Sequence, residues 1–206
     1  CMAAVRSRSC GMAESGAGRW QLSTLAGCSL AIGRYPRFAY NASGGGGLSQ
    51  PAAAAAARPT ALALALRFAP EQLQIPALDW RSTRFLGLPL PPGLSIAIAP
   101  ERLEGELDPS SGQIQLHFRA RFRFRIGSAG ASLYAAPDLL VATTLLSGPC
   151  QGQRHRASGE PRNAAGEARL VGIARVEPCG DPWLDRFLGL PDEALAELHC
   201  RLSPQP

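Results

Sequence analysis

One stretch of the chain constrains its fold more than any other, the thirteen residues from Ile114 to Ile126. Every even position in it is apolar or small: Ile114, Leu116, Phe118, Ala120, Phe122, Phe124 and Ile126. Every odd position is polar: Gln115, His117, Arg119, Arg121, Arg123 and Arg125. Strict period two predicts a β-strand with one buried face. At about 3.3 Å per residue the strand would be about 43 Å long, a length that favours a curled sheet or a barrel over a flat sheet.

The rest of the chain is also β-like in pattern. Alternating or apolar segments predict further strands over 18–32, 61–68, 94–98, 102–107, 138–146 and 167–176. The turn composition of residues 108–112 joins 102–107 to the long strand as a hairpin. No β-α-β alternation occurs, and Pro191 to Leu198 predicts a short C-terminal helix. The expected fold class is therefore all-β, an antiparallel barrel or strongly curled sheet with one terminal helix.

The 206 residues fit one domain. Residues 1–16 are nearly free of acids and read as a disordered or transit-like lead. Residues 17–206 are expected to form a single β-rich domain. Within it, a glycine run and an alanine run predict a low-complexity loop at about 43–59.

The net charge of +5 is unevenly distributed along the chain. Residues 1–70 hold seven Arg and one acid, whereas residues 71–206 hold 14 Arg and 15 acids, a balance of −1. A near-neutral body argues against nucleic acid as a partner, because such binding needs a basic face on the domain. All 21 basic residues are Arg, which is typical of a GC-rich genome. The six cysteines have no zinc-site spacing and are expected to be scattered free thiols.

The arginine face of the long strand allows three interpretations. The first interpretation is a solvated surface with partly paired charges, because the hairpin partner would place Glu104 and Glu106 on the same face as His117 and Arg119. A stripe that contacts anions or membrane lipids is the second, formed by the arginines beyond the reach of those acids: Arg121, Arg123 and Arg125. The third places the arginines inside a polar lumen, where they would bind a carboxylate.

A hexapeptide occurs twice with identical sequence, Arg84 to Pro89 and Arg186 to Pro191, and a tryptophan precedes each copy. Two apolar corners that cover the core would explain it, with Gly at the bend and Pro at the stop. The alternative is a pair of loops that dip into a membrane interface. The membrane-contacting residues would then be Trp80, Phe85, Leu86, Trp183, Phe187 and Leu188.

Catalytic and cofactor motifs are missing from the sequence. No G-x-S-x-G, P-loop or G-x-G-x-x-G occurs, and the three histidines form no evident triad or metal set. We therefore expect no enzyme activity, no catalytic residues, no cofactor and no metal.

Several phrases resemble an uncharacterised family of chloroplast proteins of plants and green algae. They are Tyr35 to Gly45, Phe85 to Pro92, Leu170 to Ala174 and Phe187 to Pro191. The resemblance implies a plastid location, with the cytoplasm as the alternative, and no known activity. Separately, Gly18-x-Trp20 at the start of a β-rich domain is similar to the lipocalin opening motif.

These observations predict a non-enzymatic, barrel-like protein that binds an apolar or amphiphilic small molecule, such as a lipid or pigment, in a plastid. The alternative is a peripheral membrane or complex-assembly factor that uses the arginine face and the Trp/Phe/Leu loops on an anionic membrane surface. The expected ligand-lining residues are the inward set of the long strand: Leu116, Phe118, Phe122, Phe124 and Ile126.

Overall fold

The fold is almost entirely β, as the alternating patterns predict. The computed structural model describes residues 18–51, 63–128 and 131–205, with 59% strand and 6% helix. The strands of the large antiparallel sheet are β1 (Arg19–Thr24), β2 (Cys28–Ile32), β3 (Phe38–Tyr40), β4 (Gly46–Leu48), β5 (Leu64–Phe68), β6 (Thr83–Phe85), β7 (Leu88–Pro89), β8 (Leu94–Leu107), β9 (Ile114–Ser128), β10 (Ala131–Ala135), β11 (Leu139–Leu146), β14 (Glu167–Val176) and β15 (Asp192–Gln205). A separate ribbon comprises β12 (Pro149–Gln151) and β13 (Arg156–Ser158). The helical segments are η1 (Pro70–Gln72) and α1 (Pro182–Leu188).

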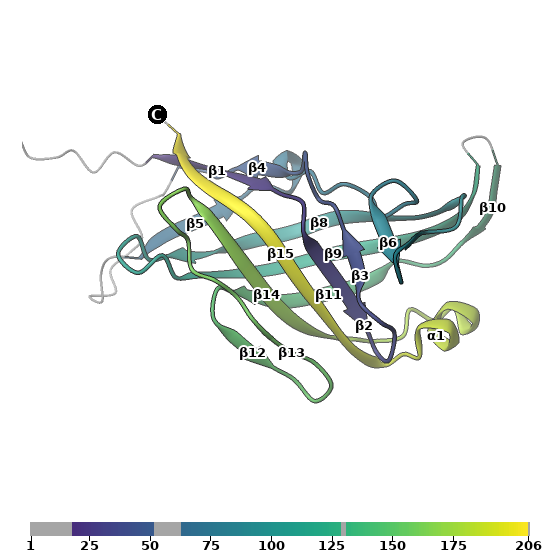
Figure 1. Ribbon diagram of the computed structural model, residues 1–206. Coiled ribbons are helices and arrows are strands. Elements are labelled where there is room, and N and C mark those ends of the chain that lie inside the picture. The colour runs from purple at the N-terminus through teal and green to yellow at the C-terminus, as the bar shows by residue number, and fades with distance from the viewer. Residues whose placement is uncertain (1–17, 52–62, 129–130, 206) are drawn as a thin grey trace, which may run out of the picture.

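The large sheet is ordered β5-β8-β9-β11-β14-β15-β2-β3-β6-β7, with β1 joining β15 to β4. It is strongly curled, and β15 and β2 cross in front of β8 and β9 in Figure 1. An isolated bridge between Ser49 and Phe68 connects the segment after β4 to β5. The Gln50 N–H also donates to the Arg67 carbonyl over 2.7 Å. Backbone hydrogen bonds therefore link β5, at one end of the strand order, to the β1–β4 side of the sheet.

Strand β9 confirms the prediction made from the alternating run. All six polar positions from Gln115 to Arg125 are exposed, while the apolar positions between them are buried or half-buried. Burial also changes along the strand. Ile114 and Leu116 are almost fully buried, whereas Phe118, Phe122 and Phe124 are only partly so. The inner face of β9 therefore passes from a tightly packed region into one where its side chains have space in front of them.

Strand β8 merges two runs whose alternation is out of phase. Leu94, Ile96 and Ile98 face inward at even positions, and Leu103 and Leu107 face inward at odd ones. A phase change within one strand requires an extra residue. The register with β9 supplies it, because Pro100 pairs with Ala120 and Arg102 with Arg119, which leaves Glu101 in a bulge.

The predicted C-terminal helix is wrong, since Asp192–Gln205 forms β15 instead. Ten residues of β15 pair with β14, and β1 and β2 cover its other edge. The period-two set Ala194, Ala196, Leu198, Cys200 and Leu202 outweighs the local helix propensity of the segment. The α-helix lies just before it, at Pro182–Leu188, where the Asp181 side chain caps the Leu184 N–H and Gly189 ends the helix with a left-handed φ of 71°.

The glycine run was expected to lie in the loop at 43–59, and part of it is strand β4, which pairs with β1. A Cβ at Gly46 would lie 2.0 Å from the Leu22 carbonyl oxygen, and one at Gly45 would lie 2.5 Å from Thr24 Oγ1. Glycine is therefore required by close backbone approach rather than by flexibility. The predicted lead at 1–16 and residues 52–59 of the predicted loop lie outside the described residues.

Candidate ligand-binding cavity

A cavity of about 580 Å³ lies inside the curled sheet. Its wall is drawn from both halves of the sheet, with β8, β9 and β11 contributing on one side and β2, β14 and β15 on the other. Nearly all the groups that face it are apolar. Representative lining residues are Leu30, Ile96, Ile98, Phe118, Phe122, Phe124, Val141, Ala174 and Leu198.

One end of the cavity is closed by tightly packed side chains. Leu22, Leu73, Leu103 and Leu145 line the cavity and belong to the largest buried cluster of the protein. The other end is open, because Trp183 and Phe187 also line the cavity and are 53% and 51% exposed. Both come from α1, which Figure 1 shows at the same end of the molecule as β6 and β10.

The structure places four of the five expected ligand-lining residues at this cavity. Phe118, Phe122, Phe124 and Ile126 all line it. Leu116 does not, since it is 0% exposed within the largest buried cluster. The sequence could not separate Leu116 from the others, because period two identifies the inward face without showing what lies opposite.

The polar atoms around the cavity are mostly bonded to the wall itself. Thr143 Oγ1 donates to the Ile173 carbonyl at 2.8 Å, and the Tyr40 hydroxyl donates to the Pro76 carbonyl. Burial raises the pKa of Tyr40 and of the Cys28 thiol, so both stay protonated and neither is an activated nucleophile. The wall therefore offers a dry surface suited to hydrocarbon.

Tyr134, near the open end, is the exception. Its hydroxyl is buried, lies beside the Asp181 carboxylate, and has no hydrogen bond of good geometry in the described part of the chain. Desolvation, reinforced by Asp181, raises the pKa of Tyr134 to about 12, so it is a neutral donor. A buried polar group without a partner is costly, and a ligand oxygen at this end of the cavity could accept a hydrogen bond from the Tyr134 hydroxyl.

The two copies of the repeated hexapeptide meet at the open end in different conformations. The first copy forms the β6–β7 hairpin, with Leu86 and Gly87 at positive φ values of 52° and 81°. The second spans the last turn of α1 and its glycine cap. Tyr35 joins them, with ring centroids 6.5 Å from Phe85 and 5.8 Å from Phe187, and its hydroxyl donates to the Phe187 carbonyl at 2.5 Å.

The expected membrane-contacting residues divide into two groups. Trp80, Leu86, Trp183 and Phe187 are exposed, by 47%, 71%, 53% and 51% respectively. The other two face inward. Phe85 is half-buried against Phe38 with ring centroids 4.6 Å apart, and Leu188 packs in a buried cluster with Val176 and Leu184.

The arginines of β9 have more acidic partners than the sequence predicts. Glu101 accepts from Arg119 Nε at 2.8 Å and from Arg121, and Arg123 Nε lies 3.3 Å from Asp138. As expected, neither Arg121 nor Arg123 pairs with Glu104 or Glu106, but both pair with acids that the sequence prediction left out, Glu101 and Asp138. The bulge in β8 turns Glu101 toward the arginine face. Arg125 forms no ion pair with any described residue.

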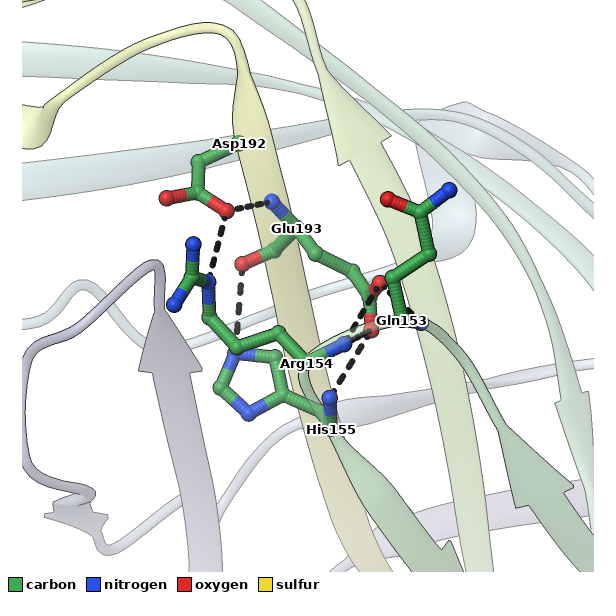
Figure 2. Close-up of polar contacts among 5 residues, drawn as sticks. All are labelled: Gln153, Arg154, His155, Asp192 and Glu193. Atoms are coloured by element: carbon green, nitrogen blue, oxygen red, sulfur yellow. Dashed lines mark hydrogen bonds and ion pairs between the residues drawn. The ribbon is translucent and has the colours of Figure 1, made fainter.

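A carboxylate site that sequence reasoning missed lies on the outer side of β15, where Glu193 sits in a backbone nest (Figure 2). Its oxygens accept from the N–H groups of Gln153, Arg154 and His155 at 2.7, 3.2 and 3.0 Å. Burial alone would raise the pKa of Glu193, but these donors outweigh burial and hold that pKa below its usual range. Because the nest is filled by the protein's own carboxylate, it anchors the β12–β13 ribbon to β15.

Within residues 18–51, 63–128 and 131–205, no cluster of His, Cys, Asp and Glu side chains is placed to hold a metal ion. None of the described helices is long and apolar enough to cross a membrane. Comparisons with protein-family models, curated proteins and solved structures found no match to this chain.

Proposed function

We propose that this protein is a non-enzymatic, barrel-like carrier that binds one apolar or amphiphilic small molecule, such as a lipid or pigment, inside the curled sheet. The observation that carries the proposal is the apolar cavity of about 580 Å³ with an open end. Pockets for small ligands commonly measure about 300–1,000 Å³ and are mainly apolar. The hydrogen bonds that link Gln50 and Ser49 to β5 support a sheet that closes on itself.

The wall chemistry supports the ligand class. Hydroxyls such as those of Thr143 and Tyr40 are already bonded to the wall, so the deep part of the cavity favours hydrocarbon. The Tyr134 hydroxyl near the open end favours a ligand with one oxygen-bearing group there. Burying about ten methylenes would contribute roughly 8 kcal/mol, which must exceed the cost of association for binding to be measurable.

The test pairs two tryptophan substitutions on one strand. Ile96 lines the cavity, whereas its neighbour Ala97 is exposed on the outer face of β8. Delipidated protein is titrated with a fluorescent fatty acid, and protein purified from its own organism is analysed by native mass spectrometry. We expect Ile96→Trp to weaken probe binding by at least about tenfold and Ala97→Trp to leave it unchanged. Protein that is consistently ligand-free and fails to bind the probe would overturn the proposal.

The plastid location stays a prediction. It rests on the resemblance and on the acid-poor N-terminal residues. Microscopy of the full-length protein fused to a fluorescent reporter would check it.

A further inference from the structure

The open end of the cavity carries most of the exposed large apolar side chains in the described part of the protein. We call five of them the rim: Leu86, Leu88, Leu133, Trp183 and Phe187, which are 51–82% exposed. Only Trp80 and Leu140 among such residues lie outside it. Aromatic contacts hold the rim together, since Tyr35 contacts both Phe85 and Phe187, and Trp183 stacks on Phe187 with centroids 5.2 Å apart. Tyr134, next to Leu133 on β10, completes the chain through Trp183.

The tip of the β6–β7 hairpin is an unusual place for leucine. Leu86 has a φ of 52° and is the only described residue other than glycine with positive φ. A left-handed conformation costs a residue with a Cβ roughly 1–2 kcal/mol, and two-residue hairpin turns of this kind normally use Asn-Gly. The Leu86 side chain is 71% exposed, so burial within the protein offsets little of this cost.

The charges next to the rim are unpaired arginines. Arg34, Arg84 and Arg186 immediately precede the aromatic residues Tyr35, Phe85 and Phe187. None of the three forms an ion pair with a described residue, whereas ten other arginines do: Arg37, Arg67, Arg102, Arg119, Arg121, Arg123, Arg154, Arg169, Arg175 and Arg201.

The acids near the rim do not offset this charge with ion pairs. Asp181 caps α1, and Asp185 accepts from the N–H groups of Cys179 and Gly180 at 2.8 and 3.0 Å. Both carboxylates accept backbone hydrogen bonds, Asp181 also lies beside the Tyr134 hydroxyl, and neither forms an ion pair with a described arginine. The Arg84 guanidinium donates to the Trp80 and Thr83 carbonyls at 2.8 and 3.2 Å, so Arg34 and Arg186 are the better placed of the three to meet an external anion.

We infer that the rim docks on a lipid bilayer that contains anionic headgroups. Exposed Trp, Phe and Leu side chains would enter the interfacial region, and the neighbouring guanidinium groups would meet lipid phosphates. Docking in this orientation points the open end of the cavity at the bilayer, which would be the source of the ligand. The docking itself does not rest on the proposed function, because it needs only the outer surface of the rim.

The test uses a double substitution that the hairpin should tolerate. Leu86→Asn places a residue that favours positive φ at the tip, and Leu88→Ser removes the second leucine. The matched control is Leu140→Ser on β11, which is 42% exposed and outside the rim. Each protein is sedimented with vesicles of phosphatidylcholine alone or with one third phosphatidylglycerol, at low and high salt. Circular dichroism checks that each variant folds.

We expect wild type and Leu140→Ser to bind the anionic vesicles and to lose binding as salt rises. The double variant should partition about tenfold less, since each leucine contributes part of its transfer free energy at the interface. Equal partitioning of wild type and double variant, or no binding to anionic vesicles at low salt, would overturn the inference. So would light scattering that shows a dimer broken by the double substitution without vesicle binding, because a second copy would then occupy the rim. Probe binding by the same proteins in solution reports separately on the cavity.

Discussion

The packing gradient along β9 makes a quantitative prediction about two inward-facing side chains of the same strand. Leu116 is 0% exposed and surrounded by the largest buried cluster, whereas Phe122 is partly buried and faces the cavity. Truncating a buried Leu to Ala removes its transfer free energy and leaves a new void, at a cost of about 2.7–5 kcal/mol. Truncating Phe in a packed core costs about 3–5 kcal/mol.

Truncating Phe122 to Ala should lower the free energy of unfolding by less than that range. One side of its ring already borders empty space, so the truncation enlarges an existing cavity and removes only the contacts on the wall side. We expect Leu116→Ala to lower the free energy of unfolding by about 4 kcal/mol and Phe122→Ala by about 2 kcal/mol. At roughly 2–4 °C per kcal/mol for a chain of this size, Tm should fall about twice as far for Leu116→Ala.

Urea denaturation of delipidated protein, followed by circular dichroism, measures both values. Leu140→Ala is the control, since Leu140 is 42% exposed and its truncation should change stability little. The slope of the transition must be the same in all variants for the comparison to hold. A loss for Phe122→Ala equal to or greater than that for Leu116→Ala would refute the reasoning, because it would mean that the interior opposite Phe122 is filled.

Two further predictions concern ionisable groups. The Glu193 nest depresses the folded-state pKa below the ordinary 4.5, so its stabilisation is present above that value and is lost as pH falls through the folded-state pKa. The hydrogen-exchange protection factors of residues 153–155, which are relative to the intrinsic rate at each pH, should therefore fall on acidification before those of β14 do, and a simultaneous fall would contradict this. Burial raises the pKa of Cys28, and raises that of Cys200 to about 12, so both thiols should resist iodoacetamide at pH 8 until denaturant is added. Rapid labelling of either thiol in the native protein, read by mass spectrometry, would count against their burial.

Sequence reasoning succeeded where one local signal dominates. The alternation of Ile114 to Ile126 fixes both the strand and its inward face, and the prediction that Glu104 shares a face with His117 is confirmed by their direct pairing. It failed where pairing with strands that are distant in the sequence determines the secondary structure. Residues 191–198 have the composition of a helix start, yet β14 and β2 recruit them as strand β15.

The repeated hexapeptide shows the same limit directly. Identical residues form a hairpin at Arg84–Pro89 and the end of a helix at Arg186–Pro191. The difference in local conformational free energy between hairpin and helix must therefore be smaller than the free energy of the tertiary contacts that select one of them. The sequence singled out three rim residues, Leu86, Trp183 and Phe187, but not that they lie together, because that depends on Tyr35 contacting both copies.

The bulge at Glu101 reverses the alternation of side chains along β8. Inward-facing residues recur every second position, and the extra residue shifts them from even to odd numbers once, between Ile98 and Leu103. Deleting one residue there would reverse the two faces of the second half of β8, turning Leu103 and Leu107 outward and Arg102 and Glu104 inward. The spacing between the two halves of β8 can therefore lengthen or shorten only by even numbers of residues, a constraint that any related chain with the same interior would share.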